Sequence, residues 1–179
     1  LSEIIRSGKV RPIGTKHSFS NLVIGEGQLV SAAGLSFDPI IDQKNSTVTV
    51  PAATKYGELA VFLEEEGYAL KNMGSLPHIS IAGSAATGTH GSGDKNQILS
   101  SSLVSFSYLD ANGVIVTLNR SSKNFEACRV GLGAYGLWVN VTLAIVPSYQ
   151  MRQDVFRNLP WEHFFEDPAN LTAAGYSVS

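Results

Sequence analysis

Residues 137 to 145 alternate regularly enough to define one strand of a sheet. The odd positions carry Leu, Val, Val, Leu and Ile, whereas the even ones include Trp138, Asn140 and Thr142. An apolar residue at every second position is typical of a strand with one buried face, which here is the odd-numbered face. Pro147 is expected to end the strand. The rest of the chain must therefore supply a sheet and a layer that covers it.

Other segments predict further strands and a few helices. Residues 103–109 and 114–118 flank Asp-Ala-Asn-Gly, a turn sequence that favours a hairpin, and residues 46–50 alternate Thr and Val like a half-buried strand. Apolar residues at helical spacing predict a helix that Thr54 caps, that runs through Glu66 and that Gly67 ends. The remaining expected elements are a helix in 1–8, a strand in 9–13 and a helix in 123–130. The sum is an α+β fold of mainly antiparallel strands.

Composition excludes several classes of function. The 13 basic and 15 acidic residues are scattered along the chain, so no clustered positive field is present for a nucleic-acid backbone. No apolar run approaches the ~20 residues of a membrane span. Cys128 is the single cysteine, which rules out an internal disulfide, and the first residues show no charged segment followed by an apolar run and a cleavage site, so no secretory leader is expected. These features favour a soluble protein of the cytoplasm that binds neither membrane nor nucleic acid.

The stretch GSLPHISIAGSAATGTHGSG (74–93) has five glycines, four serines, two threonines, two histidines and no Asp, Glu, Lys or Arg. Three glycines within 88–93 can expose consecutive N–H groups as an anion nest, to which nearby hydroxyls add donors. The stretch lacks the Lys of a nucleoside-triphosphatase loop. A flexible surface loop is the alternative, but the apolar Ile79, Ile81, Ala82, Ala85 and Ala86 favour a buried loop that contacts a ligand.

A second glycine motif, GLGAYG (131–136), matches the dinucleotide fingerprint but not its context. That fingerprint follows a strand and opens a helix, whereas here an expected helix precedes it and a strand follows. The glycines are better explained by close approach of the chain to a ligand or strand. The acidic run Glu64–Glu66 is expected to be a solvated helix end.

A third loop, IGTKHSFS (13–20), again leads from a strand into glycine and hydroxyl residues. The four histidines His17, His78, His90 and His163 lack the spacing of a metal site, so no metal is expected. A histidine beside a phosphate-binding loop could be structural, nucleophilic or a point of covalent attachment, and composition does not choose among these.

Three segments, GTKHSFSN (14–21), NMGSLPHISIAGSAATGTHGSG (72–93) and LGAYGLWVNVTL (132–143), resemble the vanillyl-alcohol-oxidase type of FAD-linked oxidoreductases, in particular the alditol (xylitol) oxidases and sugar-1,4-lactone oxidases. The resemblance runs along the whole chain and implies a two-lobed FAD-binding domain in 1–147, with lobes at about 1–50 and 51–147. Residues 148–179 would begin a truncated substrate or cap domain, so we expect the chain to be a fragment.

The same resemblance implies the site residues. His17 would bond covalently to the flavin 8α-methyl, with the loop around it at the pyrophosphate; Lys16 stands where Arg or Gly is commoner. Ser75 would lie beside the flavin and a substrate hydroxyl, and Gly74 would leave room for oxygen. Trp138 stands where an aliphatic residue usually meets the cofactor through its backbone. The resemblance therefore implies the backbone contact but does not predict where the indole packs. The full expected cofactor-binding set is Ile13, Gly14, Thr15, Lys16, His17, Ser18, Gly74, Ser75, Ser80, Gly83, Thr87, Gly88, Thr89, His90 and Trp138.

The implied reaction is oxidation of a sugar alcohol by oxygen, with FAD as cofactor and hydrogen peroxide as product. The family's base lies in the later domain, beyond Ser179, so no catalytic residue is expected here; Asp110, Glu126 and Asp154 are better explained as turn or surface carboxylates. The alternatives are an aldonolactone oxidase or dehydrogenase, and a non-catalytic flavin-binding or structural fragment. The sequence does not decide substrate, electron acceptor or oligomeric state.

Overall fold

The computed structural model describes residues 1–178. Its helices are α1 (Ser2–Arg6), α2 (Tyr56–Glu65), α3 (Ile81–Ala86), α4 (Phe125–Arg129), α5 (Trp161–Glu166) and α6 (Pro168–Thr172), with 3-10 turns η1 (Asn21–Val23) and η2 (Leu99–Ser102). Its strands are β1 (Val10–Pro12), β2 (Gln28–Val30), β3 (Ile40–Asp42), β4 (Thr47–Pro51), β5 (Tyr68–Ala69), β6 (Leu103–Leu109), β7 (Ile115–Asn119), β8 (Leu137–Ala144) and β9 (Val146–Pro147).

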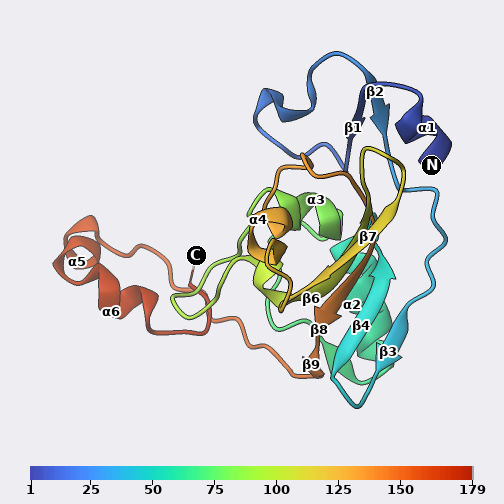
Figure 1. Cartoon of the computed structure of the whole chain (residues 1–179). Helices are drawn as coiled ribbons and strands as arrows, with labels where there is room; N and C mark the ends of the chain where they lie inside the picture. Colours follow the sequence, from blue (N-terminus) through green and yellow to red (C-terminus); the bar gives the residue numbers. More distant parts are fainter. Residues whose placement is uncertain (179) are drawn as a thin grey trace.

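A five-stranded sheet in the order β3-β4-β8-β6-β7 forms the body of the molecule (Figure 1). Every neighbouring pair in it is antiparallel. The predicted strand at 137–145 is its central strand, and the predicted hairpin is β6–β7, with Gly113 at a positive φ of 69° in the turn. The sequence-based prediction of mainly antiparallel strands is confirmed.

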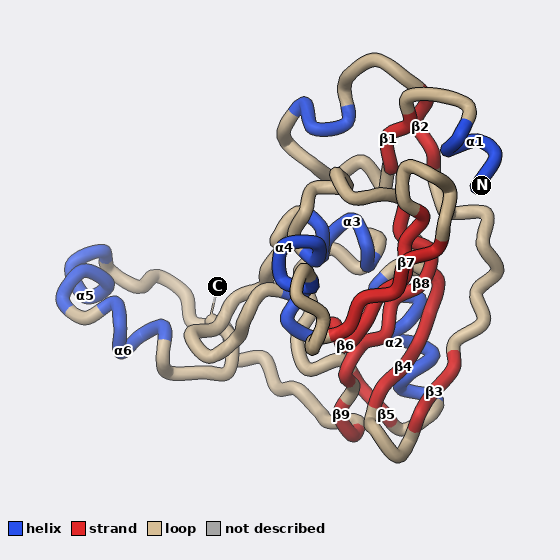
Figure 2. The backbone as a smooth tube through the Cα atoms, viewed as in Figure 1, coloured by secondary structure: helices blue, strands red, loops and turns tan. Residues whose placement is uncertain are grey.

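The main core lies between this sheet and the helices α2, α3 and α4, which Figure 2 shows packed beside the strands. Leu59 and Leu63 of α2, Phe106 of β6 and Val141 of β8 are at most 1% exposed. Gly67 follows α2 with a φ of +78°, as its predicted role at the helix end requires. The predicted cap is wrong by one residue, because Lys55 precedes the helix and Thr54 is instead buried.

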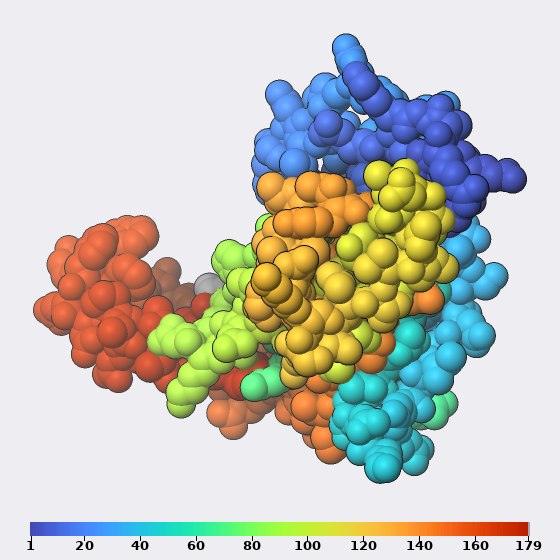
Figure 3. Space-filling view, viewed as in Figure 1, coloured from blue at the N-terminus to red at the C-terminus, as the bar shows by residue number. Residues whose placement is uncertain are grey.

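The N-terminal residues form a smaller layer at one end of the sheet, drawn in blue in Figures 1 and 3. Strands β1 and β2 pair in parallel, and Ile5 of α1 and Val30 of β2 pack with Leu109 and Leu137 at the ends of β6 and β8. This second cluster therefore ties the first strand–glycine loop to the central strand of the main sheet.

The composition of residues 74–93 suggested one continuous loop, but the structure shows that part of this stretch is helical. Residues Ile81–Ala86 form α3, because the run of small and apolar residues lets one side of the turn enter the core: Ile81 and Ala85 are at most 1% exposed. The glycine-rich remainder stays irregular, with Gly88 and Gly93 at positive φ. The backbone of α3 lies close to the N-terminal loop, because a Cβ added to Gly83 would be 3.8 Å from the Gly14 Cα.

Residues after Pro147 leave the body of the molecule, and α5 and α6 stand away from it (Figure 3). The segment returns at its end, where the Tyr176 hydroxyl donates to the Lys71 carbonyl at 2.7 Å. The domain boundaries at 50 and 147 remain predictions. Among residues 1–178, no helix is both long enough and apolar enough to cross a bilayer.

Candidate functional site

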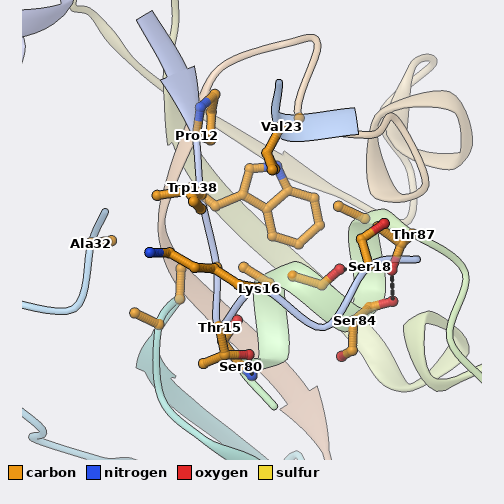
Figure 4. A pocket seen from close by; sticks show the side chains of 18 of the residues that line it. Pro12, Thr15, Lys16, Ser18, Val23, Ala32, Ser80, Ser84, Thr87 and Trp138 are labelled. Atoms are coloured by element: carbon orange, nitrogen blue, oxygen red, sulfur yellow. Dashed lines mark hydrogen bonds between the residues drawn. The ribbon is translucent and has the colours of Figure 1, made fainter. Parts of the chain in front are cut away.

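A cavity of about 270 Å³ lies where the N-terminal loop, α3 and the start of β8 converge. The first wall is the loop Ile13–Ser18, which follows β1. The second is Ile79 to Thr89, which holds α3, and the third is the segment from Leu132 to Trp138. Figure 4 shows side chains from all three walls directed into the same space.

Two glycines and a serine bring the first two walls together. A Cβ added to Gly14 or to Gly83 would lie 2.7 Å from the Ser80 Oγ in each case, so only glycine lets the two backbones approach this hydroxyl. The Ser80 Oγ is enclosed and has no hydrogen-bond partner among the described residues. An enclosed hydroxyl without a partner costs about 1–3 kcal/mol, so this cradle is suited to a bound group that supplies the partner.

Hydrogen bonds hold the N-terminal loop in place. The Ser80 backbone N–H donates to the Thr15 Oγ1 at 3.2 Å, and the Ile13 N–H donates to the Val30 carbonyl at 2.9 Å. Directly after Thr15, Lys16 adopts a φ of 63°, a left-handed conformation that costs a non-glycine residue about 1 kcal/mol. The exposed Lys16 backbone is thus held in an unfavourable conformation at the mouth of the cavity.

The lining carries positive charge and no carboxylate. Lys16 and Arg11 both line the cavity, and none of its lining residues is Asp or Glu. The Arg11 Nη1 donates to the Leu22 carbonyl at 2.5 Å, which fixes the guanidinium on this wall. Cations and backbone amides without nearby anions favour a negatively charged ligand.

Most of the residues predicted for cofactor binding meet at this cavity. Those that line it are Ile13, Gly14, Thr15, Lys16, His17, Ser18, Ser80, Gly83, Thr87, Thr89 and Trp138. Gly74, Ser75, Gly88 and His90 lie outside the lining. Ser75 is exposed, and Gly74 borders Thr89 through ordinary contacts, a Cβ there lying 3.9 Å from the Thr89 methyl.

Sequence reasoning missed part of the lining. Arg11, Ala52, Ala53 and Ser84 also line the cavity, and nothing in their local sequence marks them because they reach it from β1, from the residues after β4 and from α3. Gly133 and Gly136 of the GLGAYG motif line it as well. Their close approach to a ligand site was one of the roles expected for these glycines.

The two exposed histidines His17 and His78 lie beside each other. Their ring centroids are 4.6 Å apart and the rings meet edge to face at 61°. The His90 Nδ1 lies 2.9 Å from the Gly91 carbonyl, outside the cavity. Within residues 1–178, no group of three or more His, Cys, Asp or Glu side chains is placed to hold a metal ion.

Trp138 lies on the opposite face of β8 from the one its position predicts. The register of β8 with β6 shifts between Ser107 and Tyr108, so that Asn140 pairs with Ser107 and Trp138 with Tyr108. This β-bulge turns the indole inward. Trp138 is 5% exposed and stacks on Phe106, with centroids 4.1 Å apart and planes 14° from parallel. The prediction that it shares the half-exposed face with Thr142 is wrong.

Two groups outside the cavity lining, Tyr56 and Cys128, have raised pKa values. Burial raises the pKa of the Tyr56 hydroxyl, which has no hydrogen-bond partner among the described residues, and burial also raises the pKa of the Cys128 thiol. Both groups are therefore neutral at physiological pH and neither faces the cavity. The cavity's side chains can bind and orient a ligand, and no carboxylate base is among them.

A family model for an FAD-binding domain matches residues 5–119. The chain belongs to this family. The matched residues include the first two walls of the cavity, so FAD is its expected ligand. The unpartnered Ser80 hydroxyl, the glycine cradle and the cations all fit a ligand with a diphosphate.

Curated relatives of this FAD-binding chain are oxidases and dehydrogenases. It is 37% identical over 165 residues to the alditol oxidase of a Streptomyces species, a match that covers 91% of this chain and 39% of the relative. It is 35% identical to the L-gulono-1,4-lactone dehydrogenase of Mycobacterium tuberculosis, over 86% of this chain and 36% of the relative. It is 30% identical to the D-arabinono-1,4-lactone oxidase of Kluyveromyces lactis, over 83% of this chain and 30% of the relative. The chain thus spans well under half the length of these relatives.

The fold is shared with a solved structure, that of Physcomitrella patens BBE-like 1. The TM-score is 0.67 at 24% identity, over 77% of this chain and 31% of that one. Together with the family match, this confirms the resemblance to the vanillyl-alcohol-oxidase type and its α+β FAD-binding domain.

Proposed function

We propose that this chain is the FAD-holding part of a flavin-dependent oxidase of sugar alcohols, with FAD attached to His17. The proposal rests on one observation above all: the cavity, two of whose three walls lie within the FAD-binding family match, presents a cation-lined, carboxylate-free glycine cradle. The 37% identity to an alditol oxidase supports the choice of substrate class.

Each wall has a part in holding the cofactor. Backbone N–H groups of the loop Gly14–Ser18 and of the residues around Gly88 would neutralise the diphosphate, with Ser80, Thr87 and the Lys16 ammonium as further donors. His17 is exposed at the mouth of the cavity, where its ring can reach a flavin without displacing core residues. Ser75 is proposed to contact a substrate hydroxyl, and Gly74 to leave space for oxygen.

When bound, FAD would supply the redox chemistry: it would be the acceptor for the hydride of a CH–OH group whose hydroxyl proton leaves, and the two electrons would then pass to oxygen to give hydrogen peroxide. This chain's own residues would bind the cofactor, fix its orientation and exclude water from one side of it. The cavity lining offers no carboxylate as a base, so we place the proton acceptor in a part of the enzyme that these walls do not form.

A second candidate is an aldono-1,4-lactone oxidase or dehydrogenase. The 35% identity to a gulonolactone dehydrogenase and the 30% identity to an arabinonolactone oxidase favour it. Oxygen consumption on xylitol or sorbitol, compared with that on a lactone, separates the two. Reduction of an artificial acceptor without oxygen uptake would identify a dehydrogenase.

The attachment is tested by acid precipitation. Wild-type protein and His17→Ala are precipitated, washed and denatured, and flavin absorbance is recorded in the pellet; His163→Ala, a histidine on α5 far from the cavity, is the control. Flavin retained by wild type and control but washed out of His17→Ala would support the covalent link. Retention by His17→Ala would place the link elsewhere, and absence of flavin from native wild type would favour a structural role without cofactor.

We also propose the cytoplasm as the location, because the one cysteine, Cys128, is buried and unpaired, as in proteins of reducing compartments. Small-molecule polyols or lactones and oxygen are the proposed partners.

A further inference from the structure

The indole of Trp138 occupies a central position in the cavity that the family resemblance does not explain. Figure 4 shows the ring lying across the space between Pro12 and Thr87, with its nitrogen on the side of Val23. The residue lines the cavity although only 5% of it is exposed. One ring face is covered by Phe106, so the opposite face and the ring edge are the parts that can meet the cavity.

The indole N–H has no hydrogen-bond partner in residues 1–178. No hydrogen bond of the described protein atoms involves it, and it is not among the enclosed unpartnered atoms, which belong to Tyr56, Ser80, Ser100 and Arg129. The nitrogen therefore keeps access to the cavity. A buried Trp usually finds a partner for this donor, so the missing partner points to a ligand.

The surroundings also prepare the indole to bind in one orientation. The stack on Phe106 and the β-bulge in β8 fix the ring, and Gly136, two residues earlier, reaches a φ of 147° beside the Leu109 carbonyl. A donor that is already held in place loses little rotational freedom on binding. Arg11 donates to Leu22, the residue before Val23, so a second donor group lies on the same side of the cavity.

We propose that the Trp138 side chain is a cofactor-binding group, whose indole N–H donates a hydrogen bond to an oxygen or ring nitrogen of the bound FAD. This inference rests on the proposed FAD function and extends it, because the resemblance assigns this position only a backbone contact. Trp138 would thus add a side-chain donor to a cradle otherwise made of amides, hydroxyls and cations.

The test uses the two tryptophans of the chain, Trp138 and Trp161. Chains with ¹⁵N-labelled indoles give one N–H signal for each, and Trp161→Phe assigns them. FAD is titrated into His17→Ala protein, in which binding is reversible. The Trp138 signal is expected to shift and to exchange more slowly with water, while that of Trp161, which is 72% exposed on α5, stays in place.

Substitution gives a second readout. Trp138→Phe keeps an aromatic ring on Phe106 but removes the donor, so FAD affinity in the same His17→Ala background is expected to fall about two- to tenfold, the worth of one hydrogen bond. Trp161→Phe is the matched control and should bind as tightly as its parent. If FAD binds without shifting the Trp138 signal, or if Trp138→Phe binds FAD with unchanged affinity, this inference is overturned but the proposed function is not. If neither wild type nor His17→Ala binds FAD, both this inference and the proposed function fail.

Discussion

Removing the Ser80 hydroxyl should change stability and cofactor affinity in opposite directions. In the protein without ligand this Oγ is enclosed and unpartnered, and the residue is 3% exposed. Ser80→Ala removes a polar atom whose burial costs about 1–3 kcal/mol and loses only a small packing contribution, so the free energy of unfolding is expected to rise by about 1 kcal/mol. For a chain of this size, that corresponds to about 2–4 °C in Tm.

The same change should weaken FAD binding. If the hydroxyl donates to the cofactor, its loss costs about 1–2 kcal/mol, equivalent to about 5- to 30-fold in Kd. Denaturant titration of the apo chain gives the first quantity, and flavin fluorescence on titration of His17→Ala protein with FAD gives the second. The predicted signature is a more stable protein that binds its cofactor less well.

Ser100→Ala is the matched control. Its Oγ is likewise enclosed and unpartnered, and the residue is 0% exposed, but it does not line the cavity. It should stabilise the apo protein by a similar amount and leave FAD affinity unchanged. The reasoning is refuted if Ser80→Ala is less stable than wild type, or if both alanine variants bind FAD alike.

Two further predictions concern Gly136 in the cavity wall and Asp110 in the β6–β7 turn. Gly136→Ala should lower the free energy of unfolding by at least about 2 kcal/mol in urea titration, because its φ of 147° and a Cβ collision with the Leu109 carbonyl are both unfavourable; a wild-type midpoint would contradict this. The Asp110 carboxylate has its pKa held below 3.8, chiefly by the Val114 N–H, so its contribution to stability is present above that pH and is lost as the pH falls through the lower folded value. Asp110→Ala should therefore lower Tm at pH 7 and by progressively less as the pH falls below the ordinary range of an Asp carboxyl, and a loss that does not change with pH would argue against the turn hydrogen bonds as the cause.

Local patterns in the sequence were sufficient for much of the fold. The alternation of Leu137 to Ile145 predicted β8, and the Asp-Ala-Asn-Gly turn predicted the β6–β7 hairpin, because backbone geometry and side-chain periodicity act over a few residues. Composition also indicated residues 13–20 and 74–93 as candidate ligand-contacting segments, which stays a prediction. The identity of the ligand came from the resemblance, not from these patterns.

Tertiary structure decided which residues face the cavity. Ser80 and Thr15 are 65 positions apart, yet a hydrogen bond joins them, and the cradle exists only because Gly14 and Gly83 meet at one hydroxyl. Strand pairing likewise turned Trp138 inward: the bulge is a property of two strands in register, and the sequence of β8 by itself assigns the residue to the other face. Side-chain period is local, whereas register and the approach of distant backbones depend on the packing of the whole core.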